Sequence, residues 1–300
     1  MILASNYLNQ STLNMNQTLT QSIWLETLRR MAKSKLTTAA LIIVLIYAVV
    51  ALLAYCGIIA ANWSQEVGTS YEAPNIQHWF GTDIFGRSVL RKIIKGAQVA
   101  MNVGFVVSMI AILIGVVLGA IGGYFGGVVD EMIVWLCSTM ASIPNIMLLI
   151  SLTFILGKGI LAIYIALGMT NWVELCRLIR GEVIKHKDRE YVQAATAIGA
   201  SHVSKLWWHI LPNVLHIVII QFSGIFQIAI KSEVILSYLG LGVQNSPSWG
   251  VMINDAKVEL MQGVWWEIAF ATVAMFLIVL AFNILSDALR DALDPKLRGK

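Results

Sequence analysis

The sequence predicts an all-α polytopic membrane protein with six transmembrane helices. Of its 300 residues, 58% are apolar and only 13% are charged, whereas soluble domains carry about 25% charged residues. The mean hydropathy is +0.75. Six stretches are apolar enough to cross about 30 Å of hydrocarbon as helices of about 20 residues. This composition excludes a disordered chain, a coiled coil and a disulfide-stapled secreted module.

The six spans lie between segments that carry the charged residues. We predict them at 39–61, 96–129, 132–157, 159–179, 206–230 and 268–286. The first is longer than the apolar region of a signal peptide and no small-residue cleavage site follows it. The chain then divides into an N-terminal tail (1–35), a first transmembrane helix (36–61), a loop (62–95), a core of five transmembrane helices (96–290) and a C-terminal tail (291–300).

The distribution of Lys and Arg predicts which side of the membrane each loop occupies. With the N-terminus inside, the inner segments hold 14 of the 21 basic residues and the outer segments hold 6. The excess on the inner side places both termini in the cytoplasm. The main exception is 87–95, where basic and apolar residues alternate, and we expect this segment to be a short amphipathic helix on the outer membrane surface.

Two features within the spans suggest how the helices pack. Gly115, Gly119 and Gly123 recur every four residues on the second span, so another helix can approach that face closely. The stripe fits either a helix that lines a translocation path or simple helix packing. Pro144 in the third span predicts a kink, because proline removes a backbone hydrogen bond.

Lys231 and Glu233 are charged residues at the outer end of the fifth span. Residues two apart on a helix do not face each other, so no ion pair between them is expected. An intramembrane charge is a candidate for function. We expect instead that both side chains reach the interface by snorkelling.

The segment 181–210 is too charged to cross the membrane and too regular for a slack loop. Residues 190–198 favour a helix with Asp188 as its N-cap, and Gly199 ends it. A second short segment, 202–210, leads into the fifth span. Small side chains on the first helix would let a groove of another protein close on it. A surface helix without a partner fits the same pattern.

The spacing of Gln193-Ala194-Ala195, Gly199 and Leu211-Pro212 resembles the EAA loop of ABC importer permeases. Gln193 stands where that motif has Glu, and His209 stands where it has Ile. The run His-Ile-Leu-Pro-Asn at 209–213 fits one subfamily. The resemblance implies that the loop couples the permease to an ATPase through Glu190, Tyr191, Gln193, Ala194, Ala195, Gly199, Ala200, Leu211 and Pro212.

Four further stretches resemble the C-type subunit of dipeptide, oligopeptide and nickel importers. They are the Gly-Thr-Asp segment at 81–87, the glycine turn at 123–130, the segment 233–250 and the tail at 287–295. The chain departs from the family at Ser88, where an Asp is usual. It also departs at Trp135 and Ser138, where the family often has an Arg and an Asp.

The resemblance implies an ABC importer type I permease with the MetI-like fold in the bacterial inner membrane. The implied partners are a second permease subunit, two ABC ATPase subunits, an extracytoplasmic solute-binding protein and membrane lipid. The sequence has no GxxxxGK[ST] motif, so we expect ATP and Mg to be used by the ATPase partners. We expect no cofactor, metal, catalytic residue or nucleic acid on this chain. The implied substrates are di- or oligopeptides, with nickel or another small solute as the alternative.

Two other classes of protein would require features that differ from these. An intramembrane hydrolase or metalloprotease needs a positioned nucleophile or a set of metal ligands. His202, His209 and His216 recur every seven residues, but Pro212 interrupts that register and no acid completes a metal site. A secondary transporter is expected to show inverted repeats or discontinuous helices, and the sequence shows no convincing internal repeat.

Overall fold

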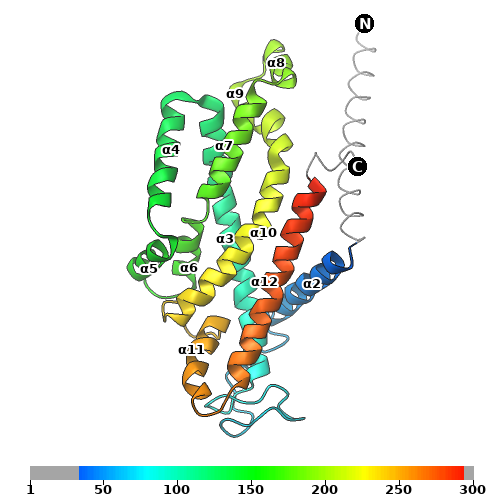
Figure 1. Ribbon diagram of the computed structural model, residues 1–300, viewed down its shortest axis with the longest axis vertical. Helices are drawn as coiled ribbons and strands as arrows, with labels where there is room; N and C mark the ends of the chain where they lie inside the picture. Colours follow the sequence, from blue (N-terminus) through cyan, green and yellow to red (C-terminus); the bar gives the residue numbers. More distant parts are fainter. Residues whose placement is uncertain (1–33, 294–300) are drawn as a thin grey trace.

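The computed structural model describes residues 34–293, which are predominantly helical (Figure 1). The helices are α2 (Lys35–Tyr55), α3 (Val89–Phe125), α4 (Gly127–Ser142), α5 (Asn145–Leu156), α6 (Ile160–Gly168), α7 (Val173–Lys187), α8 (Glu190–Ala197), α9 (His202–Ser204), the π-helical turn η1 (Lys205–Ile210), α10 (Leu211–Tyr238), α11 (Trp249–Leu260) and α12 (Trp266–Leu293). The all-α prediction is confirmed. Nearly all of the two expected tails, 1–35 and 291–300, lies outside the described residues.

The structure has the predicted six membrane spans if one broken pair of helices is counted as a single span. Within residues 34–293, five helices are long and apolar enough to cross a membrane. A sixth span results when α4 and α5, which are bent by 92° relative to each other, are counted together. The bend lies at Ile143 and Pro144, so the kink expected at Pro144 is a full break.

Helix α3 is the central element of the bundle. Its 37 residues give a length of about 55 Å, and it packs against α2, α6, α7 and α10. Val103, Val107 and Ala111 on α3 are fully buried. Figure 1 shows α2 and α12 on one flank of α3, and α4 on the other.

The expected amphipathic helix at 87–95 is wrong. Helix α3 already begins at Val89, and the side chain of Lys92 is buried against Asp83 and Glu267. Alternating basic and apolar residues predict a surface helix only when the basic side chains reach water. Here buried carboxylates, one of them 175 residues away in sequence, neutralise the lysine.

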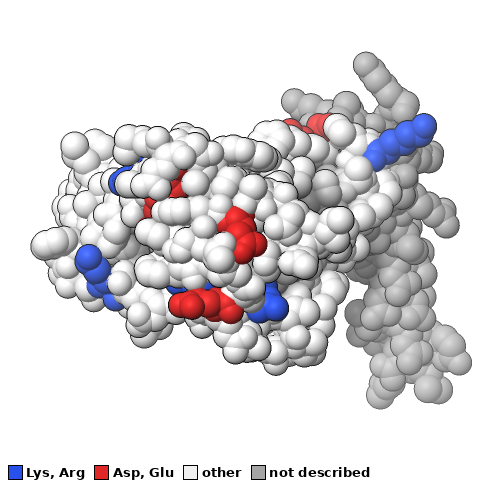
Figure 2. All heavy atoms as spheres, turned by 90° about the horizontal axis from the view of Figure 1, so that it is seen from below, with Lys and Arg blue, Asp and Glu red and all other residues white. Residues whose placement is uncertain are grey.

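The two ends of the bundle differ in character. Helices α8 and α9 project from one end, which we call the α8 end, and α11 lies near the other, which we call the α11 end (Figure 1). Figure 2 shows the α11 end face-on, with few charged side chains and with both signs present. Such a face gives little long-range electrostatic steering.

Candidate functional site

The segment between α7 and α10 projects beyond the rest of the bundle (Figure 1). Asp188, expected as the N-cap of its first helix, instead ends α7. Arg189 precedes α8 and makes no side-chain capping bond. The side-chain amide of Gln193 donates to the carbonyl of Asp188 over 3.0 Å. The junction between α7 and α8 is therefore held from within α8, by the residue that replaces the usual glutamate.

A glycine turn joins α8 to α9. Gly199 has φ +85°, and its N–H donates to the carbonyl of Thr196 while that of Ala200 donates to Ala195. A Cβ on Gly199 would meet nothing within 4 Å. Glycine is therefore required for its backbone conformation, the usual left-handed end of a helix, rather than for space.

Helix α8 has an inner face that is covered by the chain itself. Val192 and Ala195 are each 4% exposed, and α8 packs against η1, where Leu206 and Ile210 belong to the same apolar cluster as Val192. Residues three apart lie on one helix face, which explains why Ala195 points inward with Val192. The expectation that Ala195 contacts a partner is wrong, since its side chain supports the loop from inside.

The outer face of the loop carries exposed apolar residues that the sequence reasoning missed. Ile198 is 85% exposed and Val203 is 64% exposed, on the two sides of the glycine turn. Together with the exposed Ala194 and Ala197 they form what we call the apolar tip. Exposed apolar groups gathered at one place mark an interaction surface. The sequence feature that could have indicated this surface is Ile198, an apolar residue directly before the turn glycine Gly199.

Hydrogen bonds attach this loop to the transmembrane helices. The hydroxyl of Tyr191 lies 2.9 Å from Nδ1 of His186 on α7, and the hydroxyl of Tyr124 on α3 lies 2.8 Å from Nδ1 of His202. Burial raises the pKa of Tyr191, so its hydroxyl stays protonated at neutral pH. The loop is thus fixed to both α3 and α7.

The π-helical turn η1 carries the chain into α10 without a break. Pro212 has no N–H, and its ring crowds the carbonyl four residues earlier. The wider π turn directly before α10 gives that ring room. The side-chain amide of Asn213 donates to the carbonyl of His209 over 2.6 Å. The fifth span therefore extends over His202–Tyr238, beyond the predicted 206–230.

The glycine stripe on α3 serves helix packing. A Cβ on Gly115, Gly119 or Gly123 would lie 2.9, 2.5 or 2.7 Å from the carbonyl oxygens of Trp172, Cys176 and Arg180, respectively. Real Cβ atoms do not approach a backbone that closely, so each glycine lets the backbone of α7 or its N-terminal turn lie directly against α3. Of the two interpretations left open by the sequence, the structure supports packing.

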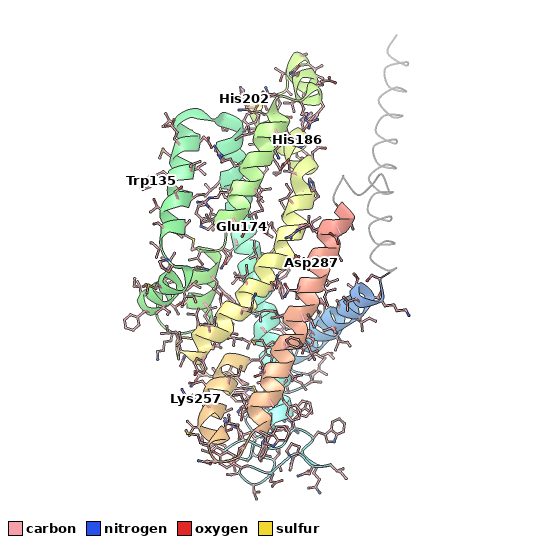
Figure 3. The ribbon with its side chains drawn as sticks, viewed as in Figure 1. Trp135, Glu174, His186, His202, Lys257 and Asp287 are labelled. Carbon is pink, nitrogen blue, oxygen red and sulfur yellow. The ribbon has the colours of Figure 1, made fainter. Side chains whose placement is uncertain are left out.

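A polar cavity of about 800 Å³ opens between the α4–α5 break, α7, α10 and α12. Pro144 lines it at the break. Four charged side chains line it: Glu174 and Arg177 from α7, and Asp287 and Arg290 from α12. Side-chain amides complete its polar wall, namely Asn145, Asn171, Gln221, Gln227 and Asn283. Figure 3 shows where Glu174 and Asp287 lie on their helices. Trp135 and Ser138 are exposed on α4 and do not line the cavity.

Glu233 was expected to reach the membrane interface, and the structure contradicts this. Its side chain is 1% exposed, and its Oε1 accepts a hydrogen bond of 2.6 Å from the hydroxyl of Ser237. Because α10 continues to Tyr238, Glu233 lies within a helix rather than at the end of a span. Lys231 is exposed, and the structure shows no ion pair between it and Glu233.

An ion cluster fixes the loop before α3 at the α11 end. Nε of Arg87 and Nζ of Lys92 lie 2.7 and 3.0 Å from Oδ2 of Asp83, and Lys92 also binds Glu267 on α12. Burial alone would raise the pKa of Asp83, but Lys92, Arg87 and the backbone N–H of Arg87 outweigh it and hold this pKa below its ordinary value. The cluster therefore ties the Gly-Thr-Asp segment to α3 and α12.

The histidines and cysteines show no arrangement typical of catalysis. Nδ1 of His209 and His216 lies within hydrogen-bonding distance of the carbonyls of Ser204 and Asn213. The buried thiol of Cys137 donates a hydrogen bond to Sγ of Cys176 over 3.8 Å, and neither cysteine is in a disulfide. Across residues 34–293, no three His, Cys, Asp or Glu side chains are placed to hold a metal ion.

Comparison with known proteins assigns the family. Residues 111–299 match the family described as binding-protein-dependent transport system inner membrane component. The chain belongs to this family. The matched region includes the glycine stripe, the cavity, the loop with α8 and α10–α12, so this all-helical, multi-pass chain is a permease subunit of the ABC importer type.

Individual relatives extend the match to most of the permease. The chain is 37% identical to the dipeptide transport system permease protein DppC of Bacillus subtilis (strain 168), over 93% of this chain and 86% of that protein. It is 37% identical to the glutathione transport system permease protein GsiD of Shigella flexneri serotype 5b (strain 8401), over 92% of this chain and 91% of that protein. It is 34% identical to DppC of Alkalihalophilus pseudofirmus, over 93% of this chain and 91% of that protein. These matches also cover residues before 111, where α2 and the Asp83, Arg87 and Lys92 part of the ion cluster lie.

Proposed function

We propose that this permease carries small peptides across the bacterial inner membrane as one of two permease subunits of an ABC importer. The observation that carries the substrate class is the 37% identity, over nearly the whole chain, to a dipeptide permease and to a glutathione permease. Both named substrates are small peptides. This favours peptides over nickel or another small solute, which stays the alternative.

The ATPase subunits dock on the loop at the α8 end. The apolar tip supports this assignment because exposed apolar residues at the end of a projecting helix fit a groove on another protein. The bonds from Tyr191 and His202 to α7 and α3 support a rigid-body transfer of force. In this arrangement ATP and Mg are bound and used by the ATPases, and this chain binds no cofactor.

The α8 end faces the cytoplasm and the α11 end faces the solute-binding protein. The excess of Lys and Arg in the segments assigned to the inside supports this orientation. Both termini then lie in the cytoplasm, and the loop before α3, fixed by the ion cluster, lies where the binding protein delivers its ligand.

Uptake by the complete importer tests the proposal. We would reconstitute this permease with its partner permease, ATPases and binding protein into liposomes and measure labelled dialanine and nickel. We expect ATP-dependent accumulation of dialanine, which unlabelled dipeptide abolishes and nickel leaves unchanged. Accumulation of nickel without dialanine, or dialanine uptake that does not require ATP, would contradict the proposed function.

A further inference from the structure

The cavity holds charged side chains that the chain itself leaves without ion-pair partners. Within the described residues, Glu174, Asp287 and Arg290 form no hydrogen bond or ion pair through their side chains, and all three are exposed. Arg177 is exposed as well and donates only to the carbonyl of Cys137, over 3.2 Å. Two carboxylates and two guanidinium groups are therefore free to bind a ligand.

All four charges lie on helices that are long and apolar enough to cross a membrane, Ile160–Lys187 and Trp266–Ala292, and the depth of Glu174 follows from its neighbour. Leu175, the neighbour of Glu174, packs against Gly115 of α3, which precedes the end of α3 by ten residues, or about 15 Å. Gly115 is near the middle of the charge-free stretch 96–129. A charge at that depth is costly against lipid and faces a bundle interior or water. The open side of this cavity therefore does not face hydrocarbon.

The four charges are arranged in the same order on both helices. Each helix carries an acid three residues before an arginine, Glu174 before Arg177 and Asp287 before Arg290. Both α7 and α12 run toward the α8 end (Figure 1). On each helix the Cα atom of the acid thus lies about 4.5 Å nearer the α11 end than the Cα atom of the arginine. Each of the two helices therefore brings one negative and one positive group to the cavity.

We propose that this cavity binds the transported peptide by its two charged termini, an inference that rests on the proposed function. Glu174 and Asp287 bind the ammonium group, and Arg177 and Arg290 bind the carboxylate. An extended dipeptide spans about 7 Å, and the long arginine side chains can cover the difference between this length and the backbone offset of about 4.5 Å. The volume of about 800 Å³ lies in the range of small-molecule sites.

The presence of both signs of charge in the cavity favours a zwitterion over an apolar or singly charged occupant. A metal cation alone would satisfy the acids and leave both arginines unpaired, and an anion would do the reverse. The surrounding amides add donors and acceptors for a peptide bond without fixing the side chains of the ligand. Such a site accepts many sequences but requires free termini.

Equilibrium dialysis of labelled dialanine tests the site directly. We would use the purified complex of permeases and ATPases without binding protein, at peptide concentrations up to about 10 mM, the range of a weak site. The variants are Glu174→Gln with Asp287→Asn, and Arg177→Gln with Arg290→Gln. The control is Glu131→Gln, an exposed carboxylate on α4 outside the cavity. We expect each double variant to bind at least tenfold more weakly and the control to bind normally.

Blocked peptides separate recognition from a structural role. N-acetyl-dialanine should bind the wild-type complex weakly, and removing the two acids should weaken it no further, whereas removing the arginines should. Dialanine amide should also bind the wild-type complex weakly. Removing the two arginines should weaken its binding no further, whereas removing the two acids should. Equal binding of dialanine by all variants, no binding by the wild type, or loss of the partner permease from the double variants would overturn the site. Dialanine uptake by the wild-type importer would still support the proposed function in each of these cases.

Discussion

Gly199 and Gly119 show that glycine is required at two positions for different physical reasons. Gly199 has a left-handed φ and open space around the missing side chain. Gly119 is helical, and its missing Cβ would lie 2.5 Å from a carbonyl oxygen of α7. The sequence alone predicts the first role, because glycine ends a helix there. It cannot separate packing from a pathway for the second, because the partner helix is about 55 residues away.

Replacing Gly199 with alanine should loosen the loop. A left-handed conformation costs a residue with a Cβ about 1–2 kcal/mol. We expect amide hydrogen exchange in 190–198 to become about fivefold faster or more. Gly181→Ala is the matched control, because Gly181 also has open space but lies in α7 without a positive φ, where alanine favours the helix. Equal exchange in both variants would show that the backbone of Gly199 is not constrained.

Asp83 should make stability depend on pH. Its pKa is lowered in the folded protein, so its contribution is present above the ordinary aspartate pKa of about 3.9 and is lost as the pH falls through the folded value. We expect Asp83→Asn to melt at a lower temperature than the wild type at pH 7, with the gap narrowing below about pH 4. Breaking a buried pair costs about 3–5 kcal/mol.

The measurement is the melting midpoint in detergent across that pH range, with Glu66→Gln as the control because Glu66 is exposed and outside the cluster. A gap that stays constant with pH would mean that Asp83 acts through shape rather than charge.

At the scale of elements, the apolar pattern predicted the spans well and their polar ends poorly. The spans follow from runs without charge, which lipid requires. The error at 87–95 arose because a buried lysine paired with Glu267 has the same local pattern as a surface lysine. The depth of Glu233 was misjudged because α10 runs eight residues beyond the predicted span. The first error concerns a charge whose partner is 175 residues away in sequence, and the second concerns the position of a helix end.

The packing of α3 on α7 gives a prediction at this scale. Gly119→Ala should force the two helices apart, because its Cβ would collide with the carbonyl of Cys176. Overpacking of this kind costs about 1–3 kcal/mol, and we expect the melting midpoint in detergent to fall by several degrees. Gly224→Ala on α10, whose Cβ would make an ordinary contact at 3.6 Å, should melt like the wild type. An unchanged Gly119→Ala would refute close α3–α7 packing.

The whole molecule has two distinct ends, and its orientation gives the next prediction. In a background without native cysteines, single cysteines at the exposed Asp188 and Gln244 should react with an impermeant thiol reagent from opposite sides of the membrane. In intact cells with a permeable outer layer, only Gln244→Cys should label. Labelling of both from the same side would contradict the proposed topology.

The central claim is that the loop carrying the apolar tip couples this permease to its ATPases. Ile198→Asp places a charge on the tip, whereas Val203→Thr changes another exposed residue of the tip without adding a charge and with little change in shape. The direct measurement is dialanine uptake together with ATP hydrolysis and the amount of ATPase that co-purifies with the complex. We expect Ile198→Asp to insert normally and retain its partner permease, but to lose uptake and either the ATPases or their stimulation by loaded binding protein. Uptake at the wild-type rate by Ile198→Asp, with a full complement of ATPases, would contradict the account.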